Sequence, residues 1–209
     1  MSHERNLASP GRFRDDDGAP DSSIRHASNH RSLVDALRVG RVIVAVVAVA
    51  DETDEIGGLT TEKSSDMSVV SMIAADGRRA MLAFTGLDAL REWDPTARPV
   101  PVSGVDAARA AIDDGCEAIV LDVAGPRLQV IPEIDLLTLA GVDPLDHARR
   151  VTVEILEGAF GSTNFDVAIV GERLRVRSGD ERIEGSTIAS SITPRILALV
   201  PGGVEVHQD

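Results

Sequence analysis

The sequence is poor in the residues that most often carry redox chemistry, aromatic stacking or nucleophilic catalysis. It has one cysteine, one lysine and no tyrosine, and aromatic residues make up 2% of its 209 residues. A single cysteine excludes an intrachain disulfide and favours a cytoplasmic location, and Cys116 is expected to be a small buried thiol. With so few aromatic rings, a platform on which nucleic-acid bases stack is disfavoured.

Clustered positive charge is also missing, as are long apolar runs. The net charge is −13 and the basic residues form no stripe, so nucleic-acid binding, which needs arginine and lysine grouped against phosphates, is disfavoured. Residues 42–50 form an apolar run of nine, whereas a membrane helix needs about 20 residues. We therefore expect neither a nucleic acid nor a membrane as partner, and instead a protein partner or self-association.

Sequence motifs of known catalytic and cofactor sites are not found. The segment 57–64 comes within one residue of a phosphate-binding loop, but Glu62 replaces the second glycine and a strand is predicted to follow where the motif needs a helix. His26 and His30 have the i, i+4 spacing of metal ligands on a helix, without an evident third ligand. The sequence thus predicts no catalytic residue, no cofactor and no metal site.

Acidic side chains at two predicted strand ends leave an alternative open. Asp51 and Asp122 each follow an apolar strand, and Glu52, Asp54 and Glu55 add further oxygen atoms near the first. In α/β proteins carboxylates at such strand ends often bind Mg²⁺ or a phosphorylated ligand, although solvated strand ends explain the pattern as well. The alternative hypothesis is a small-ligand- or divalent-metal-binding protein or enzyme that uses these acidic strand ends.

Hydrophobic periodicity predicts alternating strands and helices. Residues 42–50, apolar throughout, are typical of a strand buried on both faces. The runs 68–74 and 79–85 flank Asp76-Gly77, which predicts a hairpin with a two-residue type I′ turn. Further strands are expected at 117–123 and 127–131, and helices at 33–39, 86–92, 104–114 and 133–140.

Capping residues and prolines refine this pattern. Thr85 and Ser103 are each followed by an aspartate three residues later, so both are expected to cap a helix. Pro99 and Pro101 remove two backbone donors, so residues 99–102 are expected to form an edge strand or a polyproline-like segment.

The predicted fold class is α/β with some α+β character: a mixed β-sheet flanked by helices, followed by a β-rich C-terminal extension. A short strand is expected at 151–155, a hairpin at 165–177 and a strand at 204–206, while 183–191 is ambiguous and 195–200 is either a helix or a strand. The predicted division is a disordered tail at 1–30, an α/β domain at 31–141, a linker at 142–149 and a β-rich segment at 150–209.

Five residues form the candidate interaction surface. Arg173, Arg175 and Arg177 alternate with apolar residues, so they lie on one face of a strand and could bind an acidic partner, or simply be solvated. Trp93 stands at a helix end near Arg98 and the proline-rich edge, where it could anchor an interface. A half-buried tryptophan of the core is the other interpretation of Trp93.

Several short segments together resemble the SseB N-terminal domain family in its actinobacterial form. They are Gly40-Arg41 before the apolar strand, the hairpin residues 76–79, Phe84-Thr85, the run LREWDP at 90–95 and RPVPV at 98–102. The resemblance covers about residues 32–140 and implies an α/β domain without an established enzymatic activity. We therefore expect a non-enzymatic accessory or protein-interaction protein of unknown pathway, and enzymatic activity remains open.

Overall fold

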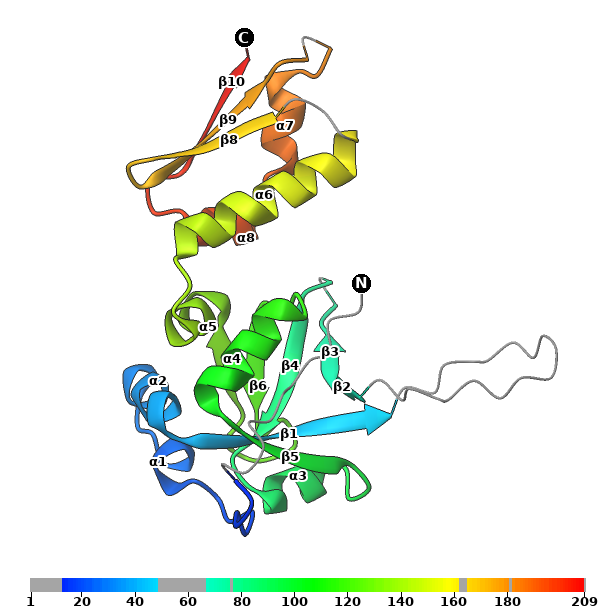
Figure 1. Ribbon diagram of the computed structural model, residues 1–209, viewed down its shortest axis with the longest axis vertical. Helices are drawn as coiled ribbons and strands as arrows, with labels where there is room; N and C mark the ends of the chain where they lie inside the picture. Colours follow the sequence, from blue (N-terminus) through cyan, green and yellow to red (C-terminus); the bar gives the residue numbers. More distant parts are fainter. Residues whose placement is uncertain (1–12, 49–66, 76, 162–164, 181, 209) are drawn as a thin grey trace, which may run out of the picture. The chain divides into compact units, whose positions relative to one another are not determined.

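The structure, a computed structural model, describes residues 13–48, 67–75, 77–161, 165–180 and 182–208 (Figure 1). Contacts within the chain divide it into two units, Met1–Ala140 and Gly141–Asp209, and each is described by itself. The acidic loop at 51–66, with Asp51, Glu52, Asp54 and Glu55, lies outside the described residues. None of the described helices has both the length and the apolar character needed to cross a membrane.

A mixed seven-stranded sheet forms the centre of the N-terminal unit (Figure 1). Its order is β2-β1-β4-β6-β7, with β5 on the other edge of β1 and β3 paired to β4; β4 and β6 are parallel and the other pairs are antiparallel. The predicted α/β class with a mixed sheet is confirmed. The strands are β1 (Arg41–Ala48), β2 (Met67–Val69), β3 (Ser71–Ile73), β4 (Arg79–Phe84), β5 (Arg98–Ser103), β6 (Ala118–Leu121) and β7 (Gln129–Pro132).

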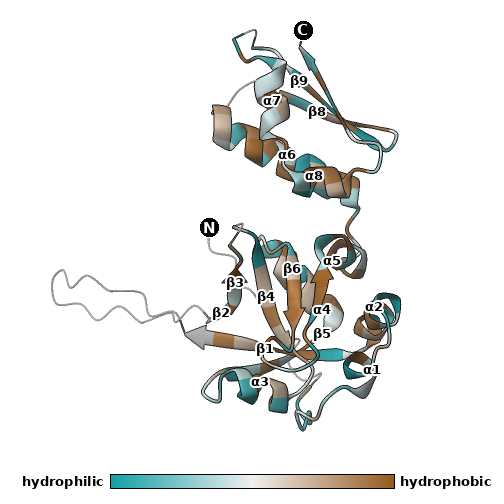
Figure 2. Cartoon of the chain, turned by 180° about the vertical axis from the view of Figure 1, so that it is seen from behind, coloured by the Kyte–Doolittle hydropathy of each residue, from teal (hydrophilic) through white to brown (hydrophobic). Residues whose placement is uncertain are grey.

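Helices cover both faces of this sheet. They are α1 (Ser22–Arg25), α2 (His30–Val39), α3 (Leu87–Trp93), α4 (Gly104–Asp113) and α5 (Glu133–Ala140). Helix α3 packs on the side of Ile43, Phe84 and Val120, whereas α2, α4 and α5 contact one another, and α4 and α5 contact the sheet. Because β6 and most of β4 consist of apolar residues, both faces of these strands can be buried (Figure 2).

The strands β1 and β4 form a fork that is filled by the segment carrying β2 and β3. They pair directly at Ile43–Phe84, and farther along β1 pairs with β2 while β4 pairs with β3. Val70 lies where the chain reverses: its N–H donates to the Ala45 carbonyl oxygen at 3.0 Å, and its own carbonyl oxygen accepts from the Leu82 N–H at 3.0 Å. One residue thereby joins both ladders.

The hairpin between β3 and β4 is present, but its turn differs from the prediction. The Gly77 N–H donates to the Ala74 carbonyl oxygen at 2.9 Å, and the Ala74 N–H donates to the Arg78 carbonyl oxygen at 2.8 Å. These bonds close a three-residue loop, in which Gly77 supplies the left-handed conformation with φ +86°. The predicted two-residue loop is therefore wrong, and Asp76 itself lies outside the described residues.

The predictions from proline and from capping residues have different outcomes. The strand β5 pairs with β1 alone, so the edge strand expected from Pro99 and Pro101 is confirmed. Ser103 caps α4 by accepting the Asp106 N–H at 3.0 Å, as expected. Thr85 is not a cap, because Gly86 occupies the N-cap position of α3 and the Thr85 side chain is bonded elsewhere.

The C-terminal unit contains a three-stranded sheet of order β10-β9-β8, in which β9 and β10 are parallel. The predicted hairpin is confirmed as β8 and β9, and helices accompany the strands. Its elements are α6 (Pro144–Phe160), β8 (Phe165–Val170), β9 (Arg173–Ser178), α7 (Gly185–Ser191), α8 (Pro194–Leu199) and β10 (Val204–Gln208). One face of the sheet is buried against helices through Leu156, Val167, Val176 and Ile188.

Helix α6 occupies the residues for which a linker at 142–149 and a strand at 151–155 were predicted, so both predictions are wrong. Asp143 caps the helix by accepting the N–H groups of Leu145 and Asp146, and Pro144 stands in its first turn. The buried residues Ala148, Thr152 and Leu156 recur every four positions, which is the helical period. The alternation at 151–155 covers only five residues, whereas the helical pattern of burial extends over a longer stretch of the chain. Of the alternatives left open at 195–200, the helix is confirmed as α8.

Candidate functional site

The sheet of the C-terminal unit has a second face that is rich in arginine. Leu174 and Val176 of β9 are buried against the helices, so the residues that alternate with them point the other way. The strand register then places neighbouring residues of β8 and β10 on the same side. We call this surface the arginine face; it consists of Asp166, Ala168 and Val170 on β8, Arg173, Arg175 and Arg177 on β9, and Glu205 and His207 on β10.

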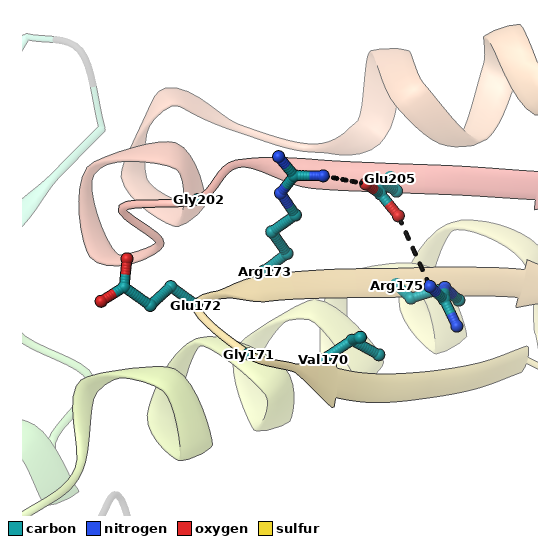
Figure 3. A pocket seen from close by; sticks show the side chains of 7 residues that line it. All are labelled: Val170, Gly171, Glu172, Arg173, Arg175, Gly202 and Glu205. Atoms are coloured by element: carbon teal, nitrogen blue, oxygen red, sulfur yellow. Dashed lines mark hydrogen bonds and ion pairs between the residues drawn. The ribbon is translucent and has the colours of Figure 1, made fainter.

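Two of these arginines share one carboxylate (Figure 3). Arg173 Nη1 lies 2.6 Å from Glu205 Oε1, and Arg175 Nη2 lies 3.7 Å from Glu205 Oε2. The hydrogen bond from Arg173 is the main cause that holds the pKa of Glu205 below its usual value. His207 Nε2 also lies 3.7 Å from Glu205 Oε2, so one carboxylate serves three basic side chains.

Two arginines of the arginine face keep donors without a partner in the part of the chain that the structure describes. Arg175 Nε is buried and has no hydrogen-bond partner there. Arg177 is exposed, lies opposite Asp166 and His207 in the register, and makes no ion pair with a described residue. Because a guanidinium group prefers several acceptors, the arginine face retains capacity to bind anionic groups.

A cavity of about 410 Å³ opens at one end of the arginine face. Its lining residues come from the β8–β9 turn, from the three strands and from the chain leading into β10, as Figure 3 shows: Val170, Gly171, Glu172, Arg173, Arg175, Gly202 and Glu205. A Cβ atom at Gly202 would lie 2.5 Å from Arg173 Cγ and 2.6 Å from the Glu172 carbonyl oxygen. Glycine is therefore required where the Arg173 side chain passes.

The five predicted interaction residues fall in two different units. Arg173, Arg175 and Arg177 come together on the arginine face, whereas Trp93 and Arg98 belong to the N-terminal unit. Trp93 is half-buried and stacks on Phe84, with ring centroids 5.5 Å apart and planes inclined by 32°. Its ring thus contributes to packing beneath α3, while Arg98 is exposed at the start of β5.

Asp122, proposed as a ligand at a strand end, is bonded within the protein. It is 7% exposed and has a left-handed φ of 51°. Its two carboxylate oxygens accept the Thr85 N–H at 2.8 Å and the Thr85 hydroxyl at 2.7 Å. Among the residues that the structure describes, no three His, Cys, Asp or Glu side chains converge as metal ligands would.

The disorder predicted for residues 1–30 does not hold for residues 13–29, which a polar network around Thr85 keeps in place, while residues 1–12 lie outside the described residues. Arg41 donates to Asp16 at 2.6 and 2.8 Å and to the Thr85 and Ala19 carbonyl oxygens at 3.0 and 2.7 Å. Arg25 donates to Asp88 at 2.7 and 2.8 Å, and its Nε donates to the Thr85 hydroxyl at 3.0 Å. The hydrogen bond from Arg25 also lowers the pKa of Asp88.

A local signal for this ordered segment was present in the sequence. Asp21 caps α1 by accepting the N–H groups of Ser23 and Ile24, and the Ile24 side chain is completely buried. Asp-Ser-Ser-Ile is therefore a cap followed by one core residue. The partners of Arg25 and Arg41, which lie up to 63 residues away, could not be found from spacing.

A second cavity, of about 310 Å³, lies between residues 27–33 and β7. Gln129 Oε1 faces this region as a buried acceptor without a partner among the described groups, and the nearby Val130 is half-exposed. His30 donates to, or accepts from, Asp135 at 2.5 Å, whereas His26 Nδ1 contacts the Ser22 carbonyl oxygen. The two histidines thus have separate partners and do not form a metal-binding pair in this arrangement.

The fold and these contacts define the N-terminal unit as an α/β domain built on a mixed sheet. The profile of the SseB protein N-terminal domain matches residues 23–134, which is more than half of the chain. The chain therefore belongs to the SseB N-terminal domain family, and the resemblance found in the sequence is confirmed. No curated protein matches the chain, and no solved structure does. The match begins within α1 and ends within α5, so the arginine face lies outside it.

Proposed function

We propose that this chain is a non-enzymatic accessory protein that binds another protein through the arginine face. The observation that carries the proposal is the row of Arg173, Arg175 and Arg177 on a sheet face that no described helix buries, in a chain with net charge −13. A local reversal of charge on an acidic protein favours a partner whose contact surface is acidic.

The character of the surface also supports a protein partner. Arginine is enriched at protein–protein interfaces because its flat guanidinium group forms several directed hydrogen bonds and packs on apolar atoms. Ala168 and Val170 supply apolar atoms beside the arginines, on the neighbouring strand. A long nucleic acid would meet the repulsion of the whole acidic chain, so it is the less favoured anionic partner.

The charged groups that hold the N-terminal segment of the N-terminal unit support an interaction role in a different way. Arg41, Arg25 and Asp122 are engaged with Asp16, Asp88 and Thr85, and these bonds hold the N-terminal segment on the ends of the strands. These side chains therefore have a structural role. The surface available for recognition is therefore sought on the C-terminal unit.

The proposal is tested by quantitative affinity capture from a lysate of the source cell. The test variant replaces Arg173, Arg175 and Arg177 by serine, and the control variant replaces Arg38, Arg109 and Arg149, which are surface arginines paired within their own helices. Both variants lose three positive charges. Wild type and control are expected to retain the same proteins, and the test variant is expected to lose them.

Equal recovery by all three proteins would overturn the proposal. Circular dichroism of each variant checks that the fold is intact, so that a loss of capture is not a loss of structure. Size-exclusion chromatography over a range of concentrations separates self-association from binding of a different protein, because a self-associating chain elutes earlier as its concentration rises.

A further inference from the structure

We infer that the arginine face binds an extended, acidic segment of its partner, with aspartate or glutamate at every second position, laid along β9. This inference rests on the proposed function and adds the chemistry and the conformation of the bound segment. It follows from the spacing of the arginines, from the charges around them and from the hydrogen bonds they lack.

The spacing of the arginines selects an extended ligand. Side chains on one face of a strand are two residues apart, which corresponds to about 6.7 Å along the strand. Arg173, Arg175 and Arg177 therefore form a row of positive charges at this interval. An extended peptide presents alternate side chains at the same interval, so three carboxylates can meet three guanidinium groups in register.

The neighbouring charges fix the row over which the carboxylates must lie. Glu205 flanks the arginines on β10, and Asp166 flanks them on β8. A ligand carboxylate over Glu205 or over Asp166 would be repelled, whereas over β9 it meets the guanidinium groups. The acidic side chains of the segment are therefore aligned with β9 and do not cross it.

The three arginines differ in the donors that they have free for a ligand carboxylate. Arg177 is exposed and without an ion pair among the described residues, so it can bind a carboxylate directly. Arg175 has a buried Nε donor without an acceptor and only a 3.7 Å contact to Glu205, so it gains hydrogen bonds when it turns toward a ligand. Arg173 is held by Glu205 at 2.6 Å, and there the ligand competes with an internal carboxylate.

This competition gives the inference a distinctive signature. Glu205→Gln removes the charge that competes for Arg173 and Arg175 and keeps the size of the side chain. If the arginine face binds carboxylates, this variant should bind the acidic segment more tightly than wild type. A purely structural role of the Arg173–Glu205 pair predicts unchanged or weaker binding.

The binding experiment uses the full chain and fluorescent peptides in an anisotropy titration at low salt, where surface charges act most strongly. The probe is Ser-Glu-Ser-Glu-Ser-Glu-Ser. The matched control peptide, Ser-Ser-Glu-Glu-Glu-Ser-Ser, has the same composition and charge, but its carboxylates are adjacent. A peptide with glutamates four residues apart on a helix-forming sequence and a single-stranded oligonucleotide of equal charge complete the panel.

The alternating peptide is expected to bind more tightly than the other three probes. Loss of one exposed arginine, in Arg177→Ser, should raise the Kd of this peptide about threefold to fivefold, as expected for exposed ion pairs. Arg109→Ser, a surface control on α4, should leave the affinity unchanged. Arg177 has no ion pair with a described residue, so its variant folds as wild type does and tests the inference without a change in structure.

Other results would overturn the inference in distinguishable ways. Equal affinity for the alternating and the block peptide would show that only total charge matters, and tighter binding of the helical peptide or of the oligonucleotide would identify a different ligand. If no peptide binds but the triple arginine variant still loses its captured proteins, the extended acidic segment is wrong and the proposed function stands. If neither peptide binding nor protein capture depends on the arginines, both the inferred acidic segment and the proposed function are wrong.

Discussion

Arg41 in the N-terminal unit and Arg175 in the C-terminal unit both project from a strand that has neighbours on its two sides, yet their surroundings differ. Arg41 is 9% exposed and donates to one carboxylate and two carbonyl oxygens. Arg175 reaches one carboxylate at 3.7 Å and keeps a buried donor without a partner.

The difference follows from the places that the two arginines occupy. Arg41 stands at the start of β1, where chain ends and loops supply carbonyl oxygens and where Asp16 can fold over it. Arg175 stands in the middle of an open sheet face, where the backbone oxygens are used by the neighbouring strands. An arginine at a strand end is thus easily satisfied from within, while one on a sheet face requires side chains or a partner.

The comparison predicts that loss of Arg41 has the largest effect on stability. Arg41→Met would leave the carboxylate of Asp16 without its partner and release residues 13–21, at a cost of about 3–5 kcal/mol. Urea denaturation followed by the fluorescence of Trp93, the one tryptophan of the sequence, reports on the N-terminal unit. A cost below about 1 kcal/mol would show that the buried pair is not essential to the fold.

Loss of the Asp122 carboxylate is expected to come next. Asp122→Ala removes both acceptors of the Thr85 bonds and places alanine at a left-handed φ of 51°, which together cost about 2–3 kcal/mol. Asp122→Asn keeps one acceptor and tolerates that conformation, so it should lose about half as much. Equal losses in the same urea titration would show that charge, and not backbone conformation, dominates at this position.

A pH titration distinguishes the ion pair of Arg25 from the other contacts of the N-terminal unit. Arg25 holds the pKa of Asp88 below its ordinary value of 3.8, so the stabilisation is present above that value and is lost as the pH falls through the lower pKa of the folded state. Arg25→Gln should therefore be less stable than wild type at pH 7, and the difference should shrink below about pH 4. A difference that is the same at pH 3 and pH 7 contradicts this account.

The arginines of the arginine face should have the smallest effect on folding among these substitutions. Arg173→Ser, Arg175→Ser and Arg177→Ser are each expected to change the free energy of unfolding by no more than about 0.5–1 kcal/mol, because exposed ion pairs contribute little. Circular dichroism in urea measures this for the C-terminal unit. A loss near that of Arg41 would mean that the arginine face is structural, and the contrast between the two units would disappear.

Divalent cations should have no effect on either unit. We expect the melting temperature to shift by less than about 1 °C with Mg²⁺ or Ca²⁺ at millimolar concentration. A ligand that binds only the folded state raises stability with the logarithm of its concentration relative to its Kd, and a cation that does not bind leaves stability unchanged. A clear upward shift would favour the alternative of a metal-binding protein. The acidic residues 51–55 would then be the first to replace, with Asp122→Asn as the comparison.

The predictions made from the sequence were most accurate where a few neighbouring residues determine the local structure. Pro99 and Pro101 cannot donate to a second neighbour, so β5 had to lie at an edge. The alternation from Arg173 to Arg177 fixed which side chains share a face, and Gly171 marked the turn of that hairpin. In each case the deciding interactions lie within a few residues.

The predictions failed where residues distant in the sequence determine the local structure. Thr85 stands where the sequence predicts a helix cap, but Asp122, which directly follows the neighbouring strand β6, accepts hydrogen bonds from its hydroxyl and its N–H. Residues 13–29 have the composition of a disordered tail, but Arg41 and Asp88 bind them from afar. At α6, the strand-like run from Val151 to Ile155 is overruled by a helix cap eight residues earlier and by burial every fourth residue.

The fork at Val70 divides the large sheet into a body and an arm. Near Ile43 the strand β1 pairs with β4 and β5, whereas beyond Val46, at Val47 and Ala48, it pairs with β2. Val70, whose N–H and carbonyl oxygen belong to different ladders, is the residue that joins the two parts. Loss of the β1–β2 pairing would therefore free the last residues of β1 and leave the β1–β4 pairing at the centre of the domain intact.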